Sequence, residues 1–341
     1  MSNGKAKDRK MSDARRSVLK GAAAGLAGLV ATSSRAESRA AGQNMAAPPI
    51  SDYRNLYPKG PFSEQPQNWP GLASKMLPRP DHGEETYHGN GKMAGRKCLI
   101  TGGDSGIGRA VAIAFAREGA DVAINYLPQE EEDAREVIAL IKKEGRKAIA
   151  LPGDLRDEAF CKKLVNDAAR QLEGLDTLVN VAGRQKFYKD IVEMTTEDFD
   201  WTMKTNIYAL FWLVRAAVPL LPKGGVIINT ASTNAYEPME ILIDYSMTKA
   251  AITNMTKSLA KQLGPRAIRV NAVAPGPFWT ALQTSGGQPK EKYMPMGQDT
   301  VIGRVGQPVE IAPTYVTLAS SEASYLTGQV WGITGGNGLP G

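Results

Sequence analysis

The chain has 341 residues, with 41 Lys and Arg against 35 Asp and Glu, a formal net charge of +6. The excess is local: residues 1–36 contain eight of these basic residues and two of the acidic ones, which leaves 33 of each and no net charge in the rest. A basic balance confined to one terminus gives no reason to expect nucleic acid or another polyanion as a partner.

Residues 1–36 have the pattern of an export signal. Arg15 and Arg16 precede a charge-free stretch, residues 21–34, rich in Ala, Gly and Leu. Paired arginines before a short apolar segment are typical of a twin-arginine signal, and the stretch is too short to span a hydrocarbon core of ~30 Å comfortably. We expect export by the twin-arginine machinery, a periplasmic protein and no stable membrane insertion. The alternative is a basic tail or an uncleaved anchor, with a cytoplasmic protein.

Residues 37–94 are expected to form an extended arm on the surface of a domain that spans residues 95–341. The arm is rich in Pro, Gly, Asn and Ser, without sustained periodicity. Its aromatic residues Tyr53, Tyr57 and Trp69 are the expected anchors, because a wholly disordered linker would carry fewer of them. Both histidines of the chain also lie here, near acidic residues, but the signal is weak and we expect no metal site.

A glycine-rich turn follows the arm. Residues 97–101 read as a short buried strand and residues 109–116 as a helix, and between them lie Gly102, Gly106 and Gly108. Such a turn lets the backbone approach a pyrophosphate at the helix N-terminus, where amide groups and the helix dipole favour anions. The strand–turn–helix context indicates a dinucleotide site.

The rest of the chain alternates apolar runs with amphipathic segments, which predicts a parallel sheet covered on both faces. The expected strands are residues 97–101, 121–125, 148–151, 177–181, 226–229, 268–273 and 329–333. The fold class is therefore a single-domain α/β protein with a Rossmann-type doubly wound sheet of about seven parallel strands flanked by helices. Ligands on such sheets bind beyond the carboxyl ends of the strands, where the polar and glycine-rich residues of this chain also gather.

Tyr245 is the only tyrosine with a lysine, Lys249, four positions on. Residues at this spacing share a helix face, and a fixed cation lowers the pKa of a phenol, which is ordinarily ~10. Ser232 ends the preceding strand region and can hydrogen-bond a carbonyl oxygen whose proton Tyr245 gives or takes. The Tyr-Lys pair alone is a chance-level pattern, and its place after a dinucleotide turn makes it the expected site of proton transfer.

With these motifs in this order, residues 94 to 336 resemble the short-chain dehydrogenase/reductase family, in its compact single-domain branch. Residues 66–72 and 80–87 also resemble a bacterial subgroup with an N-terminal extension. The resemblance implies that Tyr245 is the general acid/base, that Lys249 lowers its pKa and holds the nicotinamide ribose, and that Ser232 polarises the carbonyl. Asn206 would sit in a local helix distortion and position a proton-relaying water.

The resemblance also implies a set of cofactor contacts along the chain. The glycine turn would hold the pyrophosphate, Asp154 and Leu155 the adenine, and Thr280 the nicotinamide carboxamide. The expected contacts are Gly102, Asp104, Ser105, Gly106, Ile107, Gly108, Asn125, Tyr126, Asp154, Leu155, Asn180, Ala182, Gly183, Tyr245, Lys249, Pro275, Gly276, Phe278 and Thr280.

Several residues keep a second interpretation. Asn206 can be an ordinary polar position in a helix over residues 199–221, and Thr280 can be a helix N-cap. Val181 stands where the family often has Asn, which bears on stability more than on chemistry. Phe278 stands where isoleucine is commoner, and its side chain can reshape the nicotinamide pocket.

The choice between NAD and NADP is only partly readable. An acidic residue at the end of the second strand favours NAD and an arginine favours NADP, whereas here the strand ends in the neutral Asn125 and Tyr126. Asp104 and the acidic run at residues 130–133 put negative charge near the place of a 2′-phosphate. We therefore favour NAD over NADP, although the acidic run can equally be the solvated first turn of a helix.

The predicted function is an NAD(P)-dependent oxidoreductase that interconverts an alcohol and an aldehyde or ketone. Residues 281–298, rich in Gly, Pro and Met, are expected to form a mobile lid that sets the substrate. Aromatic residues near the rim favour a mostly apolar pocket; they are Phe187, Tyr188, Tyr236, Phe278 and Trp279. The resemblance implies a homotetramer. The alternatives are a non-catalytic dinucleotide-binding sensor and, less favoured by the glycine spacing, a sugar-nucleotide epimerase.

Overall fold

The computed structural model describes residues 51–338. Within this range seven parallel strands form one sheet in the order β3-β2-β1-β4-β5-β6-β7, which confirms the predicted fold class. The strands are β1 Lys97–Thr101, β2 Asp121–Tyr126, β3 Ala148–Pro152, β4 Thr177–Asn180, β5 Val226–Thr230, β6 Arg269–Pro275 and β7 Val330–Ile333. The predicted export signal and the first part of the arm lie outside the described residues.

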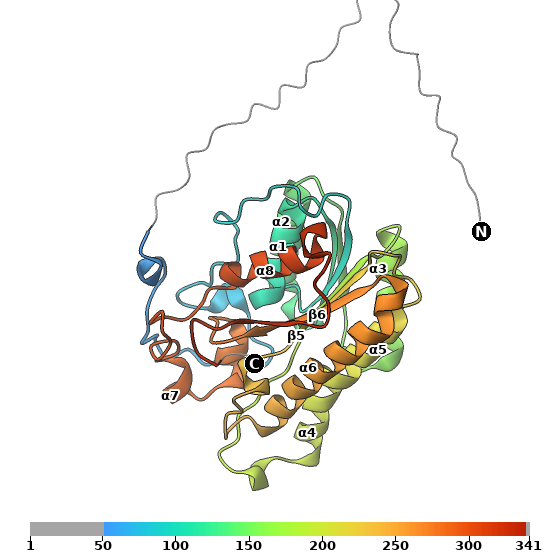
Figure 1. Ribbon diagram of the computed structural model, residues 1–341. Helices are drawn as coiled ribbons and strands as arrows, with labels where there is room; N and C mark the ends of the chain where they lie inside the picture. Colours follow the sequence, from blue (N-terminus) through green and yellow to red (C-terminus); the bar gives the residue numbers. More distant parts are fainter. Residues whose placement is uncertain (1–50, 339–341) are drawn as a thin grey trace, which may run out of the picture. The chain divides into compact units, whose positions relative to one another are not determined.

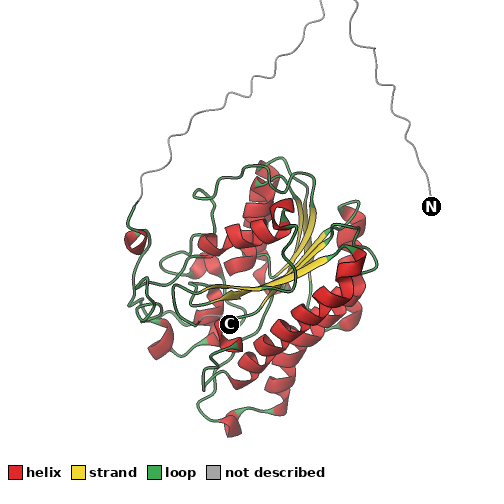
Figure 2. Cartoon of the chain, viewed as in Figure 1, coloured by secondary structure: helices red, strands yellow, loops and turns green. Residues whose placement is uncertain are grey.

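Helices cover both faces of the sheet, as Figures 1 and 2 show. Helices α1, α2 and α8 lie on one face, and α3, α5 and α6 lie on the other. Their bounds are α1 Gly106–Arg117, α2 Glu131–Lys143, α3 Glu158–Gln171, α4 Thr196–Met203, α5 Ala209–Ala217, α6 Ile243–Leu263, α7 Lys290–Tyr293 and α8 Pro308–Ala319. Among the described residues no helix combines the length and apolar character needed to cross a membrane.

The sheet separates two apolar layers because successive strand residues point to opposite faces. In β1, Cys98 and Ile100 pack with α1 and α8, whereas Leu99 packs with α3 and α5. All three side chains are fully buried. Strands buried on both faces read as continuous apolar runs, which is why the strand positions are legible in the sequence.

The strand order reverses between β1 and β4, and this reversal positions the site. Chain connections leave β1 toward β2 on one side and later return to β4 on the other, so a crevice opens at the carboxyl ends of β1 and β4. Thr101, at the end of β1, is in register with Asn125 of β2 and with Asn180 of β4. The glycine turn therefore begins at the mouth of this crevice.

The long helix expected over residues 199–221 is divided in the structure. Helix α4 passes into a π-helical segment, Lys204–Tyr208, before α5 begins. Asn206 lies in this π segment, the kind of local distortion that is frequent at functional sites.

The arm packs on the domain, but not through every expected aromatic residue. The Tyr57 hydroxyl donates to Asp81 at 3.0 Å, whereas Tyr53 is 59% exposed and is no anchor. The buried anchor is Phe62, whose ring stacks on Trp279 with 4.0 Å between centroids. Large apolar area buried at such a contact supplies most of its stabilisation.

Candidate active site

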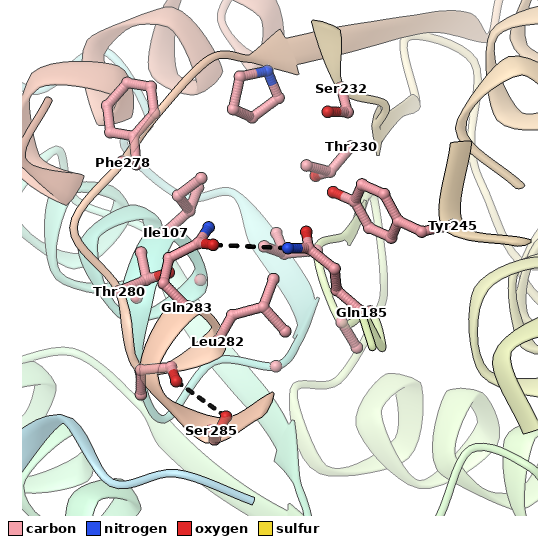
Figure 3. A pocket seen from close by; sticks show the side chains of 18 of the residues that line it. Ile107, Gln185, Thr230, Ser232, Tyr245, Phe278, Thr280, Leu282, Gln283 and Ser285 are labelled. Carbon is pink, nitrogen blue, oxygen red and sulfur yellow. Dashed lines mark hydrogen bonds between the residues drawn. The ribbon is translucent and has the colours of Figure 1, made fainter. Parts of the chain in front are cut away.

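A cavity of about 680 Å³ opens at the carboxyl ends of the strands, within the range of about 300–1,000 Å³ common for small-molecule and cofactor sites. Its walls come from the glycine turn, the ends of β2 to β6, the start of α6, residues 275–299 and the arm. Figure 3 shows the inner part, where Ser232, Thr230 and Tyr245 face Ile107, Phe278 and Thr280. The structure thus brings together residues that lie far apart in the sequence.

The glycine turn has the geometry of an anion cradle. Gly102 and Gly106 have positive φ values of 64° and 49°, which L side chains rarely adopt. A Cβ atom added at Gly108 would lie 1.9 Å from the Gly102 carbonyl oxygen. Helix α1 begins at Gly106, so its free amide groups face the cavity. The positive φ values and the close approach of Gly108 to Gly102 require glycine, and the turn fits the pyrophosphate of a dinucleotide.

Ser232, Tyr245 and Lys249 lie together on the inner wall, and each is at most 7% exposed. The Ser232 hydroxyl accepts a hydrogen bond from the Asn234 backbone amide at 3.1 Å, which fixes its position. The Lys249 ammonium donates to the Thr230 carbonyl at 2.8 Å and lies 5.3 Å from the centre of the Tyr245 ring. One turn of α6 separates the phenol from the ammonium, as the spacing predicted.

The expectation that Lys249 holds the pKa of Tyr245 below its ordinary value is wrong for this arrangement. Burial raises the pKa of Tyr245 to about 12, with a hydrogen bond to Ser232 acting in the opposite direction. Burial also lowers the pKa of Lys249 to about 8. Burial disfavours the charged form of each group, so the phenol is protonated at neutral pH.

Asn206 and Asn180 do not line this cavity and border a small void beside it. The Asn206 side chain accepts from the Arg184 amide at 2.7 Å and donates to the Arg184 carbonyl and to Thr248. Asn180 donates to Asn229 at 2.9 Å, which joins two strands. The other predicted catalytic and cofactor residues all line the cavity.

The part of the cavity near Asp104, Glu130 and Asp154, where the adenosine of a dinucleotide is expected, we call the adenosine end. It has more acidic than basic residues, but two of the acids are protonated over much of the pH range. Asp104 is 1% exposed, and its Oδ2 has no hydrogen-bond partner within residues 51–338. Burial raises the pKa of Asp104 to about 7. Burial and the neighbouring Asp104 raise the pKa of Glu130 well above its usual range. The repulsion of a 2′-phosphate expected from these acids is therefore weakened at neutral pH.

The neutral side chains at the end of β2, Asn125 and Tyr126, form hydrogen bonds within the protein. The Asn125 amide donates to the Leu151 and Gly153 carbonyls, and the Tyr126 hydroxyl donates to Glu131 at 2.6 Å. Both line the cavity, but the Asn125 amide nitrogen and the Tyr126 hydroxyl already have hydrogen-bond partners within the protein.

The end of the cavity near Ser232 and Tyr245, which we call the carbonyl end, has polar side chains beside apolar ones such as Phe278 and Leu282. Of the five aromatic residues predicted near the rim only Phe278 lines it, and Trp279 is buried against Phe62 instead. Polar residues missed by the sequence reasoning take their place; they are Gln185, Asn234, Gln283, Ser285 and Gln288. Gln185 follows Gly183 by two positions, a spacing that offered a signal.

The arm also reaches the site, which the sequence did not indicate. Trp69 and Gly71 line the cavity, and a Cβ atom at Gly71 would lie 2.9 Å from that of Ser285. The Ala73 amide donates to Asp133, at the start of α2, at 2.6 Å. The arm therefore connects the cofactor side of the cavity with the segment after Thr280.

A doubly wound sheet with a glycine turn at its point of reversal defines a Rossmann-type dinucleotide-binding protein. A family model described as Enoyl-(Acyl carrier protein) reductase matches residues 102–337. The chain belongs to the short-chain dehydrogenase/reductase family, and it is an oxidoreductase of that type.

Named relatives and solved structures agree with this assignment. The chain is 54% identical over 290 residues to an Escherichia coli protein named uncharacterized oxidoreductase YghA, covering 85% of this chain and 99% of that one. It is 41% identical to NADPH-dependent aldehyde reductase 1 of Arabidopsis thaliana, covering 78% and 94%. A short-chain dehydrogenase from Burkholderia cenocepacia, solved in complex with NADP, superposes with a TM-score of 0.67 at 33% identity, covering 72% and 98%. These relatives give no support to the expected preference for NAD.

Proposed function

We propose that the protein interconverts an alcohol and an aldehyde or ketone, using a nicotinamide dinucleotide that supplies or accepts the hydride when bound. The observation that carries this proposal is the buried cluster of Ser232, Tyr245 and Lys249 on the inner wall of the cavity that the glycine turn borders. The relative from Arabidopsis, named an aldehyde reductase, supports a carbonyl substrate.

Each member of the cluster has a distinct task in this proposal. Ser232, held by the Asn234 amide, donates to the carbonyl oxygen and orients it. Tyr245, protonated at neutral pH because burial raises its pKa to about 12, gives its proton to the same oxygen during reduction. Lys249 supplies positive charge beside the phenol as that proton leaves, and its ammonium is fixed by the Thr230 carbonyl.

Asn206 acts through its neighbours in this proposal. Its side chain bonds both the amide and the carbonyl of Arg184, and a Cβ atom added at Gly183 would lie 3.5 Å from the Asn206 amide oxygen and 3.7 Å from the Lys249 ammonium. We assign it the positioning of the loop after β4 and of Lys249. The water-mediated proton relay implied by the family resemblance remains a prediction.

Cofactor choice depends in this proposal on two acids at the adenosine end, the buried Asp104 and the half-buried Glu130. Charged carboxylates repel a 2′-phosphate, whereas protonated carboxyls donate hydrogen bonds to it. We propose that NAD is preferred above neutral pH, where Asp104 ionises, and that NADP is accepted below it. The NADP and NADPH complexes of related structures support acceptance of the phosphorylated cofactor.

The test is turnover by the full chain of a panel of aldehydes and ketones with NADH and with NADPH, followed by nicotinamide absorbance. We expect carbonyl reduction with at least one cofactor. Tight cofactor binding without turnover of any carbonyl or alcohol would contradict the enzyme proposal and favour a dinucleotide sensor.

We also propose a homotetramer and export through the twin-arginine machinery. The family resemblance implies subunit contacts through the helices around residues 199–221 and 245–263. Exposed apolar side chains there support assembly: Tyr208 and Phe211 are 47% and 45% exposed, and Met247 is 50% exposed. Light scattering gives the subunit number. Replacing Arg15 and Arg16 by Lys should retain the protein in the cytoplasm if the signal is used.

A further inference from the structure

Two glutamine side chains meet at the carbonyl end of the cavity. Gln185 is 4% exposed, and its amide nitrogen donates to the Gly287 carbonyl at 2.7 Å and lies 3.5 Å from the Gln283 amide oxygen. Figure 3 shows the two carboxamides pointing toward each other, joined by a dashed line, in the cavity that Tyr245 also lines. The Gln185 amide oxygen accepts no hydrogen bond from the part of the chain that the structure describes.

A third glutamine continues this polar lining. The amide oxygen of Gln288 is buried and has no hydrogen-bond partner within residues 51–338. Its amide nitrogen lies 3.7 Å from the Met239 sulfur, and a thioether is a weak acceptor. Met239 in turn donates its backbone amide to Asn234 at 3.0 Å, beside the carbonyl-binding Ser232. The amide oxygens of Gln185 and Gln288, which accept no hydrogen bond from the described residues, therefore belong to the same cavity as Ser232 and Tyr245.

Buried amide groups without partners are unfavourable unless a ligand satisfies them. An alkyl chain in this position would exclude water and leave the amide oxygens unpaired. A hydroxyl group donates one hydrogen bond and accepts others, so it complements an amide, which offers both a donor and an acceptor. The lining favours a substrate that carries hydroxyl groups.

The charged residues of the cavity do not favour an anionic substrate. Lys292 and Glu237 both line the cavity, but both are exposed and have opposite charges. The buried polar groups at the carbonyl end are neutral amides and hydroxyls, apart from Lys249, which donates to the Thr230 carbonyl, and they lie among apolar side chains such as Phe278 and Ala281. Because these lining groups are uncharged, they favour a substrate with hydroxyl groups over one with carboxylates or phosphates.

We infer that the substrate is a hydroxylated carbonyl compound, with a hydroxyl on a carbon next to the carbonyl, and that Gln185 binds this hydroxyl. The inference rests on the proposed function and names its substrate class. In reduction the hydride adds to the carbonyl carbon, the C=O π electrons pass to oxygen, and Tyr245 protonates that oxygen. The dinucleotide is oxidised, and the neighbouring hydroxyl is unchanged, so the product is a vicinal diol.

The test compares pairs of substrates that differ by hydroxyl groups: hydroxyacetone with acetone, and glyceraldehyde with propionaldehyde, each with NADH and NADPH. Sites built to bind a hydroxyl reject analogues that lack it by about 10⁴–10⁵ at the extreme, and we expect kcat/KM to favour the hydroxylated member at least 100-fold. Equal kcat/KM within each pair would overturn the inference and leave the proposed function intact. Absence of turnover for all four, while other carbonyls of the wider panel are reduced, would overturn the inference alone, and absence of turnover across the whole panel would contradict both.

Substitution of Gln185 then tests whether its amide causes the preference for hydroxylated substrates. Gln185→Leu should lower kcat/KM for hydroxyacetone at least tenfold and leave that for acetone unchanged or raised. The control, Gln329→Leu, changes an exposed glutamine next to β7 that does not line the cavity and should alter neither value. Gln288→Leu is the second variant if Gln185→Leu does not fold. A loss shared equally by both substrates would overturn the assignment.

Discussion

The two ends of the cavity are both polar and both buried, but they are built from different chemistry. At the adenosine end, Asp104 and Glu130 are carboxyl groups whose pKa values burial raises into or beyond the neutral range. At the carbonyl end, Gln185 and Gln288 are amides that do not titrate. The charge facing the adenosine of the cofactor should therefore change with pH, whereas the amides that bind the substrate should not, and the pH dependence of the carbonyl end comes from Tyr245 and Lys249.

The largest expected effect separates chemistry from cofactor binding. Tyr245→Phe removes the proton donor at the carbonyl end, and general acid catalysis is typically worth about 10²–10⁴ in rate. We expect kcat for carbonyl reduction to fall by that factor, measured by nicotinamide absorbance. The Kd for the dinucleotide, measured by fluorescence, should stay within about twofold.

A variant that kept a tenth or more of wild-type kcat would show that another group supplies the proton. Ser232→Ala is the companion change. It removes the oriented hydroxyl and should also lower kcat, with the phenol still present.

The second effect concerns the cofactor end alone. Gly108→Ala places a methyl group 1.9 Å from the Gly102 carbonyl, and overpacking against backbone costs about 1–3 kcal/mol. The turn must open, so we expect dinucleotide affinity to fall at least tenfold, measured by calorimetry, with a lower melting temperature.

Gly264→Ala is the matched control, because a Cβ atom there meets open space and the residue has helical φ. Such a change at a compatible site typically stabilises by about 0.4–1 kcal/mol. Equal loss of affinity in both variants would contradict the proposed role of the turn.

These two predictions concern the parts of the site that could be predicted from the sequence. Gly102, Gly106 and Gly108 are recognisable because no other residue type fits the turn, and Tyr245 and Lys249 because one helical turn fixes their spacing. Strand positions were legible because strands buried on both faces are continuously apolar.

The other parts of the site could not be predicted from the sequence, because they depend on contacts between segments that lie far apart in the chain. Trp69 and Gly71 reach the cavity only because the arm packs against residues near Ser285, and no local periodicity encodes that contact. Asn125 and Asn180 have the residue type of ligands, but their amides bond neighbouring strands or loops. The position of Trp279 likewise follows from a stacking partner more than 200 residues earlier, Phe62.

The third prediction uses pH at the carbonyl end. Alcohol oxidation needs Tyr245 as the phenolate, and its pKa of about 12 leaves that form rare at neutral pH. Below the pKa the phenolate fraction rises tenfold per pH unit, so kcat/KM for oxidation should rise from pH 7 to 9. Reduction uses the protonated phenol and the Lys249 ammonium, whose pKa is about 8, so kcat/KM for reduction should fall over the same range. A flat oxidation profile over this range would show that the bound cofactor lowers the pKa of Tyr245 below 7.

The smallest effect concerns cofactor choice at the adenosine end. Asp104 has a raised pKa of about 7, so it is neutral at pH 6 and charged at pH 8, facing Glu130, Asp133 and Arg109. The ratio of kcat/KM for NADH to that for NADPH should therefore increase about three- to tenfold between these values. Asp104→Asn, which is neutral throughout, should flatten this dependence.

The titration of Asp104 should also affect the stability of the folded protein. An aspartate with an ordinary pKa of ~3.9 when unfolded and about 7 when folded binds more protons in the native state between these values. Its contribution favours folding below about pH 4 and is lost as the pH rises toward 7. The melting temperature of Asp104→Asn should exceed that of the wild type most clearly at pH 8. Equal pH profiles for both proteins, in melting and in cofactor choice, would show that Asp104 is not the group that gives the adenosine end its variable charge.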